Sequence, residues 1–145
     1  MKKIILLYLL FSACIAYIFA QTSKEKLFDL TINIEKFEQL TGKLYIAVYN
    51  KKEDFRKEDK IYKYQILPIH ETKKTIIFKN LPKGIYAIST YHDVNENGKL
   101  DTNFWGIPKE PYGFSNNPRI FMGPPSFVES HIVLAADQQI HIVLK

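Results

Sequence analysis

Short runs in which apolar and polar residues alternate are the strongest constraint on how this chain can fold. A period of two residues is typical of a half-buried β-strand, and no segment shows a convincing amphipathic helix pattern. Seven such runs, separated by turn-forming residues, cover residues 27–34, 44–49, 61–66, 75–78, 85–92, 130–134 and 139–144. We therefore predict an all-β fold, an antiparallel β-sandwich of immunoglobulin-like or prealbumin-like type, with about seven strands and one long ordered loop.

Two pairs of these runs are close enough along the chain to suggest hairpins. Residues 27–34 and 44–49 flank a Thr41-Gly42 turn, and residues 130–134 and 139–144 flank Ala136-Asp137. Residues 50–60 are highly charged, with Phe55 as the one strong apolar residue, and we expect an exposed connection there.

The first twenty residues have a different character. Lys2 and Lys3 precede the apolar residues 4–19, and the small residue Ala20 stands before Gln21. This pattern predicts a signal peptide over residues 1–20, a single domain over residues 21–145, and export to the periplasm or the medium. Two alternatives remain: a retained membrane anchor, because the apolar run is long, and a lipoprotein signal ending at Cys14.

Charge and cysteine content exclude some classes of function. Cleavage after Ala20 would lower the formal net charge from +5 to +3, because Lys2 and Lys3 leave with the signal peptide. The remaining basic residues are mixed with acidic ones and form no dense basic block, so we predict no nucleic-acid partner. Cleavage would also remove Cys14, the only cysteine, so the mature domain could form no disulfide. Since the apolar run would leave with the signal peptide, we predict no membrane insertion of the mature domain.

Residues 93–101 form the stretch with the most specific chemistry. Asp93, Asn95 and Asn97 place side-chain oxygens on alternate residues, Gly98 allows a sharp turn, and Asp101 adds a second carboxylate. Calcium loops of the EF-hand type use this spacing, with a backbone carbonyl at the seventh position, which is Lys99 here. The sequence thus predicts a calcium site formed by Asp93, Asn95, Asn97, Lys99 and Asp101. Phe104 stands where the closing glutamate is expected, and Asn97-Gly98 is alternatively a plain hairpin turn.

Residues 102–126 show no regular period, because five prolines and three glycines interrupt them. The segment is nevertheless rich in aromatic residues, which argues against disorder. We expect an ordered loop packed over one end of the sheet, with Trp105 at least partly shielded. Its aromatic and amide side chains suggest a surface that contacts a sugar or peptide, with the candidate ligand-binding residues Trp105, Tyr112, Phe114 and Asn116. Alternatively, the rings form a small core beneath the loop.

Four motifs in order carry a family resemblance: LPKGIYAI at residues 81–88, HDVNENGKLD at 92–101, WGIPKEPYGFSNN at 105–117 and MGPPSF at 122–127. From about Leu27 to Leu144 the chain resembles the DUF2141 family of uncharacterised bacterial secreted proteins, which has no established activity. One departure is Glu110-Pro111-Tyr112, where a glycine near Pro111 is expected. The Asp93 stretch is also similar to the calcium-binding B-type repeats of bacterial surface adhesins, and that similarity implies a cation in the loop.

The leading functional hypothesis is a secreted or periplasmic, non-catalytic module. In it, calcium stabilises the Asp93 stretch, and the long loop presents a binding surface to a protein or glycan of the cell envelope. The alternative is a hydrolase that uses His92, Asp93 or Ser115. Neighbouring strand residues point to opposite faces, which places His92 and Asp93 poorly for acting together. We therefore assign no catalytic residue.

Overall fold

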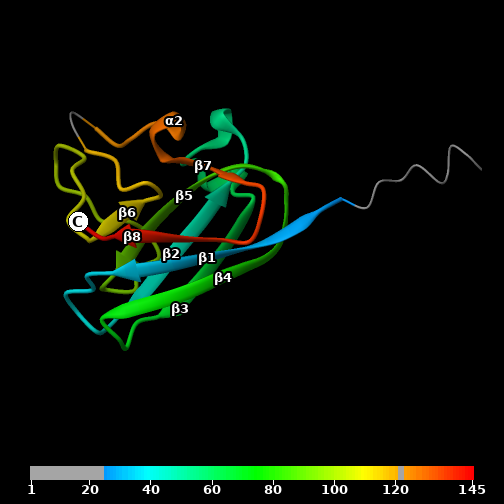
Figure 1. The fold of residues 1–145 in the computed structure, drawn as a ribbon. Coiled ribbons are helices and arrows are strands. Elements are labelled where there is room, and N and C mark those ends of the chain that lie inside the picture. Colours follow the sequence, from blue (N-terminus) through cyan, green and yellow to red (C-terminus); the bar gives the residue numbers. More distant parts are fainter. Residues whose placement is uncertain (1–24, 121–122) are drawn as a thin grey trace, which may run out of the picture.

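The computed structural model describes residues 25–120 and 123–145, and the strands in these residues form two sheets that face each other (Figure 1). The three-stranded sheet has the order β4 (Lys73–Pro82), β1 (Leu27–Glu35), β8 (Gln138–Val143). The larger sheet has the order β3 (Lys63–Pro68), β2 (Lys43–Tyr49), β5 (Gly84–Asp93), β6 (Tyr112–Phe114), and β7 (His131–Leu134) also pairs with β5. The predicted all-β sandwich is confirmed, with eight strands in the described residues.

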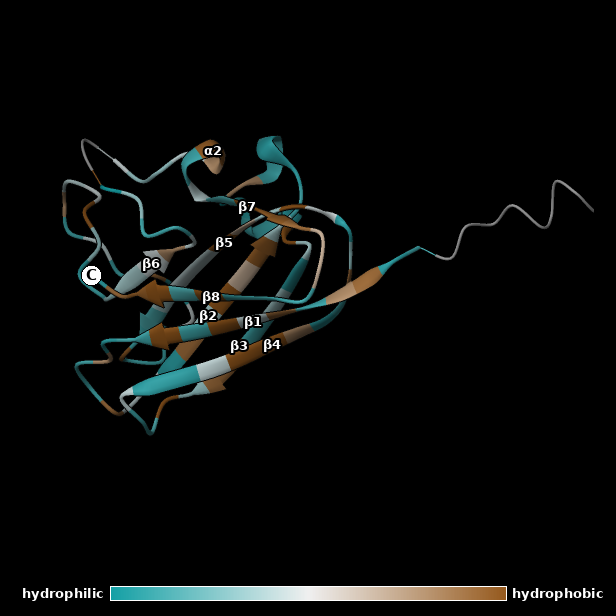
Figure 2. Cartoon of the chain, in the orientation of Figure 1, coloured by the Kyte–Doolittle hydropathy of each residue, from teal (hydrophilic) through white to brown (hydrophobic). Residues whose placement is uncertain are grey.

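The core forms because alternate residues of each strand turn inward, as the period of two predicted. Figure 2 shows hydrophobic segments alternating with hydrophilic ones along β1 and β2. Leu30, Ile32 and Ile34 of β1 are fully buried, and they meet the equally buried inward residues of β2, namely Leu44, Ile46 and Val48. Burying each of these side chains contributes roughly 1.5–3 kcal/mol, so the interface between the sheets is a large source of stability.

Both predicted hairpins are wrong. β1 pairs with β4 in antiparallel and with β8 in parallel orientation, whereas β2 pairs with β3 and β5. β7 likewise pairs with β5, while β8 returns to β1 in the other sheet. The connections 36–42 and 135–137 thus carry the chain from one sheet to the other. Alternation fixes which face of a strand is buried, but it does not fix which strand lies beside it.

A second, smaller core lies at one end of the larger sheet and includes part of the long loop. The connection 50–60 forms two short 3-10 turns, η1 (Lys52–Asp54) and η2 (Glu58–Lys60), and it buries Phe55. The Phe55 ring lies 5.4 Å from Tyr49, 6.1 Å from Phe114 and 5.7 Å from Phe127. Phe127 opens the short helix α2 (Phe127–Ser130), whose start is fixed by a capping box between Ser126 and Glu129.

The strand β6 brings the long loop back to the sandwich at a point that requires glycine. A Cβ atom on Gly113 would lie 2.6 Å from the side chain of Ile142, so only glycine lets β6 approach the core this closely. Tyr112 exchanges two main-chain hydrogen bonds with Lys145, of 3.2 and 2.9 Å, which places the C-terminus beside β6 (Figure 1).

The predicted signal peptide, residues 1–20, lies outside the described residues. Across residues 25–120 and 123–145, no helix has the length and apolar character needed to cross a bilayer.

Candidate functional site

The loop that follows β5 is organised around the buried carboxylate of Asp93. One oxygen of Asp93 accepts a hydrogen bond from the Asn97 N–H (3.1 Å), and the other accepts one from the Gly98 N–H (2.8 Å). Gly98 has a φ of +83°, the left-handed conformation that favours glycine, so its position in the motif is explained by the turn. Asp93 is fully buried, and these bonds satisfy a charge that would otherwise be costly to bury.

The other predicted calcium ligands gather around the same turn. The Asn97 N–H also donates to the Asn95 side-chain oxygen (3.1 Å). The side-chain amides of Asn95 and Asn97 both donate to the carboxylate of Asp101, at 2.7 and 3.0 Å. The hydrogen bond from Asn97 and, to a lesser extent, the one from Asn95 hold the pKa of Asp101 below its usual value. Lys99 joins through its N–H, which donates to the Asn97 side-chain oxygen (3.0 Å).

The spacing of the motif therefore brings the four predicted ligand side chains together, but it supplies only two carboxylates. Within residues 25–120 and 123–145, no group of three or more His, Cys, Asp or Glu side chains is placed to hold a metal ion. Calcium binds through oxygen atoms, whereas Asn95 and Asn97 direct their amide nitrogens at Asp101. Both amides would have to turn for a cation to bind, and calcium at this loop stays a prediction.

Glu110 is the residue of this site that sequence analysis missed. It is only 8% exposed, and its carboxylate bridges the two ends of the loop. One oxygen accepts from the Val94 N–H (2.8 Å), and the other accepts from the Asp101 N–H (3.0 Å). The neighbouring Lys109 N–H donates to the Asp101 carbonyl (2.8 Å). The departure at Glu110-Pro111-Tyr112 marked this position as unusual, but nothing in the sequence indicated that the carboxylate is buried or which N–H groups it binds.

The turn Thr41-Gly42 packs against the main chain at the start of the loop. A Cβ atom on Gly42 would lie 2.2 Å from the Asp93 carbonyl oxygen, so only glycine allows this close approach. The buried His92 donates from Nε2 to the Thr41 carbonyl (2.6 Å), and its Nδ1 has no hydrogen-bond partner in the described residues. A hollow of about 280 Å³ lies beside the loop, lined in part by Glu38, His92, Asp101 and Glu110.

The residues of the alternative hydrolase hypothesis do not meet. Ser115 is fully buried, where its hydroxyl accepts from the Ile88 N–H (2.9 Å) and donates to the Ser130 carbonyl. Ile88 and His92 are four residues apart on β5, a separation of roughly 13 Å along a strand. Asp93 bonds to the main chain of the loop and His92 to that of the turn, so each of the three side chains forms hydrogen bonds with main-chain groups.

The aromatic residues of the long loop separate into two groups. Phe104 and Trp105 are 94% and 81% exposed, so the expectation that Trp105 is shielded was wrong. They lie on a tight turn in which the Asn103 side-chain oxygen accepts from the Trp105 and Ile107 N–H groups, at 2.9 and 3.0 Å. A bridge between Thr102 and Pro108 closes this turn, which is too small to cover its own rings.

The other candidate ligand-binding residues lie against the sandwich. Phe114 is buried in the second core, and Tyr112 packs against it, so the alternative of a small core beneath the loop is confirmed for these two. Asn116 is exposed, but its amide donates to the His131 carbonyl (2.6 Å) and fastens the loop to β7. Of the four candidates, only Trp105 has a largely exposed ring.

These observations define a β-sandwich with an Asp- and Asn-rich loop whose two ends are held together by a buried carboxylate. The turn that follows this loop exposes two aromatic rings. The family model described as "Uncharacterized protein conserved in bacteria (DUF2141)" matches residues 32–142. The chain belongs to this family, as its four motifs indicated. Comparison with curated proteins and with solved structures finds no match.

The role of Glu110 predicts the effect of Glu110→Gln. The amide can accept only one of the two main-chain bonds, and its NH₂ group faces the other N–H, so we expect a loss of about 1–3 kcal/mol in the free energy of unfolding. Urea denaturation measures this loss, and faster hydrogen exchange at Val94 and Asp101 locates it.

Glu96→Gln is the matched control, because Glu96 lies in the same loop and forms only an exposed ion pair with Lys43 (2.8 Å). We expect it to change stability by less than about 0.5 kcal/mol. Equal stability of Glu110→Gln and the unmodified protein would contradict the bridging role.

Proposed function

We propose that the protein is a secreted or periplasmic, non-catalytic β-sandwich module whose long loop contacts a protein or polymer of the cell envelope. The observation that carries the proposal is the exposed apolar tip of the turn 102–108. Phe104, Trp105 and Ile107 are 94%, 81% and 58% exposed, and the rings of Phe104 and Trp105 lie 5.4 Å apart. Large aromatic residues in such positions are the usual anchors of binding surfaces.

The rigidity of the turn supports this role. The Asn103 side chain fixes the main chain on both sides of Gly106, and the Gly106 N–H donates to the Asn103 carbonyl (2.9 Å). At the base of the turn, the Lys109 N–H donates to the Asp101 carbonyl. The Glu110 carboxylate accepts from the Asp101 N–H and from the N–H of Val94, the residue that follows β5. A preorganised tip loses little conformational entropy on binding, so more of the contact energy remains as affinity.

Export predicts a defined N-terminus. Because Ala20 precedes Gln21 at the end of the apolar run, the protein recovered from the periplasm or medium of the producing cell should begin at Gln21 and carry no lipid. Intact-mass measurement of that protein tests this. A mass that includes Met1, or one that shows acylation at Cys14, would refute a soluble exported form.

Trp105 provides the test of the binding surface, since it is the only tryptophan of the chain. In the free protein we expect emission typical of a solvent-exposed indole, shifted to shorter wavelength on addition of purified envelope glycan or purified envelope protein. Phe104→Ala should weaken that association roughly thirtyfold, because truncating an anchor residue costs about 2 kcal/mol or more.

Ile77→Ala, which truncates a half-exposed apolar residue on β4, is the control and should leave the association unchanged. If Phe104→Ala also binds as the unmodified protein does, the tip is not the contact surface. If neither class of envelope material moves the Trp105 emission, the proposed function itself fails.

We also propose that calcium stabilises the loop of residues 93–101. Support comes from the mutual proximity of the predicted ligands: Asp101 is bonded to both Asn95 and Asn97, and the Asn97 N–H is shared between Asp93 and Asn95. Turning the two amides would direct their oxygens to the Asp101 carboxylate, where a cation would replace the two hydrogen bonds. With two carboxylates we expect a dissociation constant of about 10⁻⁴–10⁻³ M, as in extracellular calcium modules.

This proposal predicts a thermal shift. At a dissociation constant of about 10⁻⁴ M, roughly 10 mM calcium should stabilise the fold by about 2.7 kcal/mol and raise Tm by at least about 5 °C. Magnesium should have little effect, because its small octahedral shell retains water. Asp101→Asn should abolish the rise, whereas Glu96→Gln, the same change of charge at a residue that is not a predicted ligand, should retain it. A Tm indifferent to calcium and to chelator would favour the plain turn.

A further inference from the structure

The outward face of the five-stranded sheet carries a cleft of about 450 Å³ that no part of the proposed function uses. Its shape follows from the register of three strands. Ala47 of β2 lies beside Tyr64 of β3 on one side and Ser89 of β5 on the other. The neighbouring row, two residues along each strand, consists of Ile66, Tyr45 and Tyr91.

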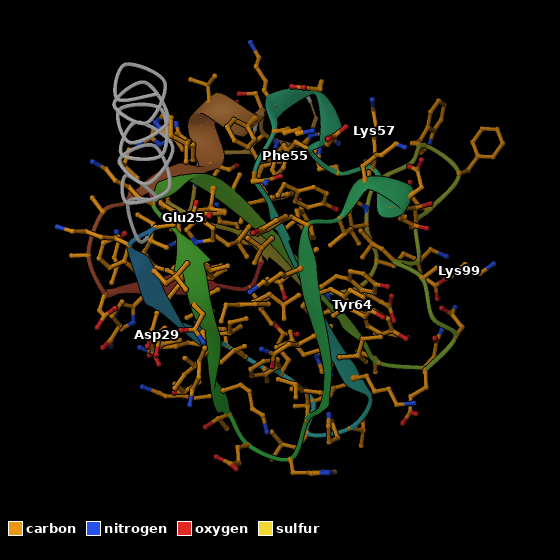
Figure 3. All side chains as sticks on the ribbon, turned by 90° about the vertical axis from the view of Figure 1, so that its right-hand side faces the viewer. Glu25, Asp29, Phe55, Lys57, Tyr64 and Lys99 are labelled. Carbon is orange, nitrogen blue, oxygen red and sulfur yellow. The ribbon has the colours of Figure 1, made fainter. Side chains whose placement is uncertain are left out.

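Small residues at the centre of large ones create the hollow. Ala47 lies between Tyr45 and Tyr49 on the outer face of β2, and outward residues of one strand are about 7 Å apart. Ala47 and Ser89 thus form a floor that the tyrosines surround. The turn η2 contributes Glu58 and Asp59 to one wall, and Gly98 of the loop contributes to another. Figure 3, which labels Tyr64 on β3, shows the loop that carries Lys99 on the same side of the molecule.

Three of the four tyrosine rings that line the cleft are held in place. Tyr45 and Tyr91 stack with their centroids 4.8 Å apart and their planes within 9°. The Tyr91 hydroxyl donates to the Gly98 carbonyl (3.3 Å), which ties this ring to the loop. Tyr49 packs edge-on against the buried Phe55. Tyr64, in contrast, is largely exposed and is free to cover a ligand.

We propose that this cleft binds a neutral sugar residue of a glycan. The partly or largely exposed rings of Tyr45, Tyr64 and Tyr91 offer apolar surface to the C–H face of a pyranose ring. Glu58, Asp59 and Ser89 offer acceptors for its hydroxyl groups, and a hydroxyl that donates to a carboxylate forms a strong, charge-assisted bond. Tyrosine, carboxylate and serine together match a ligand that has one apolar face and many hydroxyl donors.

Charge restricts the ligand further. Of the described residues that line the cleft, two are acidic and none is basic, although the protein as a whole is basic. The Tyr91 hydroxyl is uncharged at neutral pH, as tyrosine ordinarily is, and burial, followed by the nearby Tyr45 and acidic side chains, raises its pKa further. Asp59 also forms an exposed pair with Lys60 (3.5 Å), but Lys60 lies outside the lining. A phosphate or uronate would lack a cationic partner here, so the cleft selects neutral sugars.

The test is calorimetric titration of the protein isolated from its producing cell with the neutral hexasaccharides cellohexaose, maltohexaose and chitohexaose, and with the anionic hexagalacturonate. At least one neutral oligosaccharide should bind, and hexagalacturonate should bind at least about tenfold more weakly. Ala47→Leu fills the floor without touching the core and should weaken binding about tenfold or more, while Tyr64→Ala removes an exposed ring and should weaken it by up to about tenfold. Ile85→Ala, an exposed position on β5 outside the cleft, should bind as the unmodified protein does.

Three results would overturn the proposal: no binding of any neutral hexasaccharide, equal binding of hexagalacturonate, or unchanged binding by both Ala47→Leu and Tyr64→Ala. Thermal unfolding of each variant shows that it is folded. The inference goes beyond the proposed function, because the cleft and the aromatic tip use different residues. Sugar bound in the cleft should leave the Trp105 emission unchanged, so the two experiments fail independently.

Discussion

The carboxylate of Glu110 holds the two ends of the loop after β5 together, and the arrangement of the candidate surfaces depends on it. Its two oxygens bind the N–H groups of Val94 and Asp101, which are seven residues apart in the chain. The aromatic turn begins directly after Asp101, and Gly98 of the same loop closes one side of the tyrosine cleft. A buried charge with two good donors fixes geometry strongly, because moving either donor would leave the carboxylate desolvated and unpaired.

The sequence predicted the local part of this arrangement and missed the distant part. Asp93, Asn95 and Asn97 come together because Asp and Asn side chains bond to main-chain N–H groups two to five residues ahead, and this is encoded in spacing alone. Glu110 approaches from beyond the aromatic turn, and no short spacing relates it to Val94. The residue that closes the loop therefore could not be identified from the pattern that identified the loop.

A similar limit applies to the fold. The alternation in β1 correctly predicted that Leu30, Ile32 and Ile34 face the core, since burial follows from the period of two. It did not predict that β8 lies parallel to β1, because strand neighbours are set by contacts between distant segments. The aromatic richness of residues 102–126 predicted burial, which is correct for Phe114. It is wrong for Trp105, whose position is fixed by the hydrogen bonds of Asn103. Composition describes a segment as a whole, whereas burial is decided residue by residue.

Strand β2 shows how one strand can serve both the core and the proposed cleft without conflict. Its inward residues Leu44, Ile46 and Val48 fill the core, and its outward residues Tyr45, Ala47 and Tyr49 shape the cleft. Neighbouring residues of a strand point to opposite faces, so the outer face can change while the inner face keeps its packing. Ala47 has a low intrinsic preference for strands, and a larger β-branched residue would suit the pleated surface better. Its presence between two tyrosines is explained if the space above it is used, and the core on the other face of β2 makes the weaker strand former tolerable.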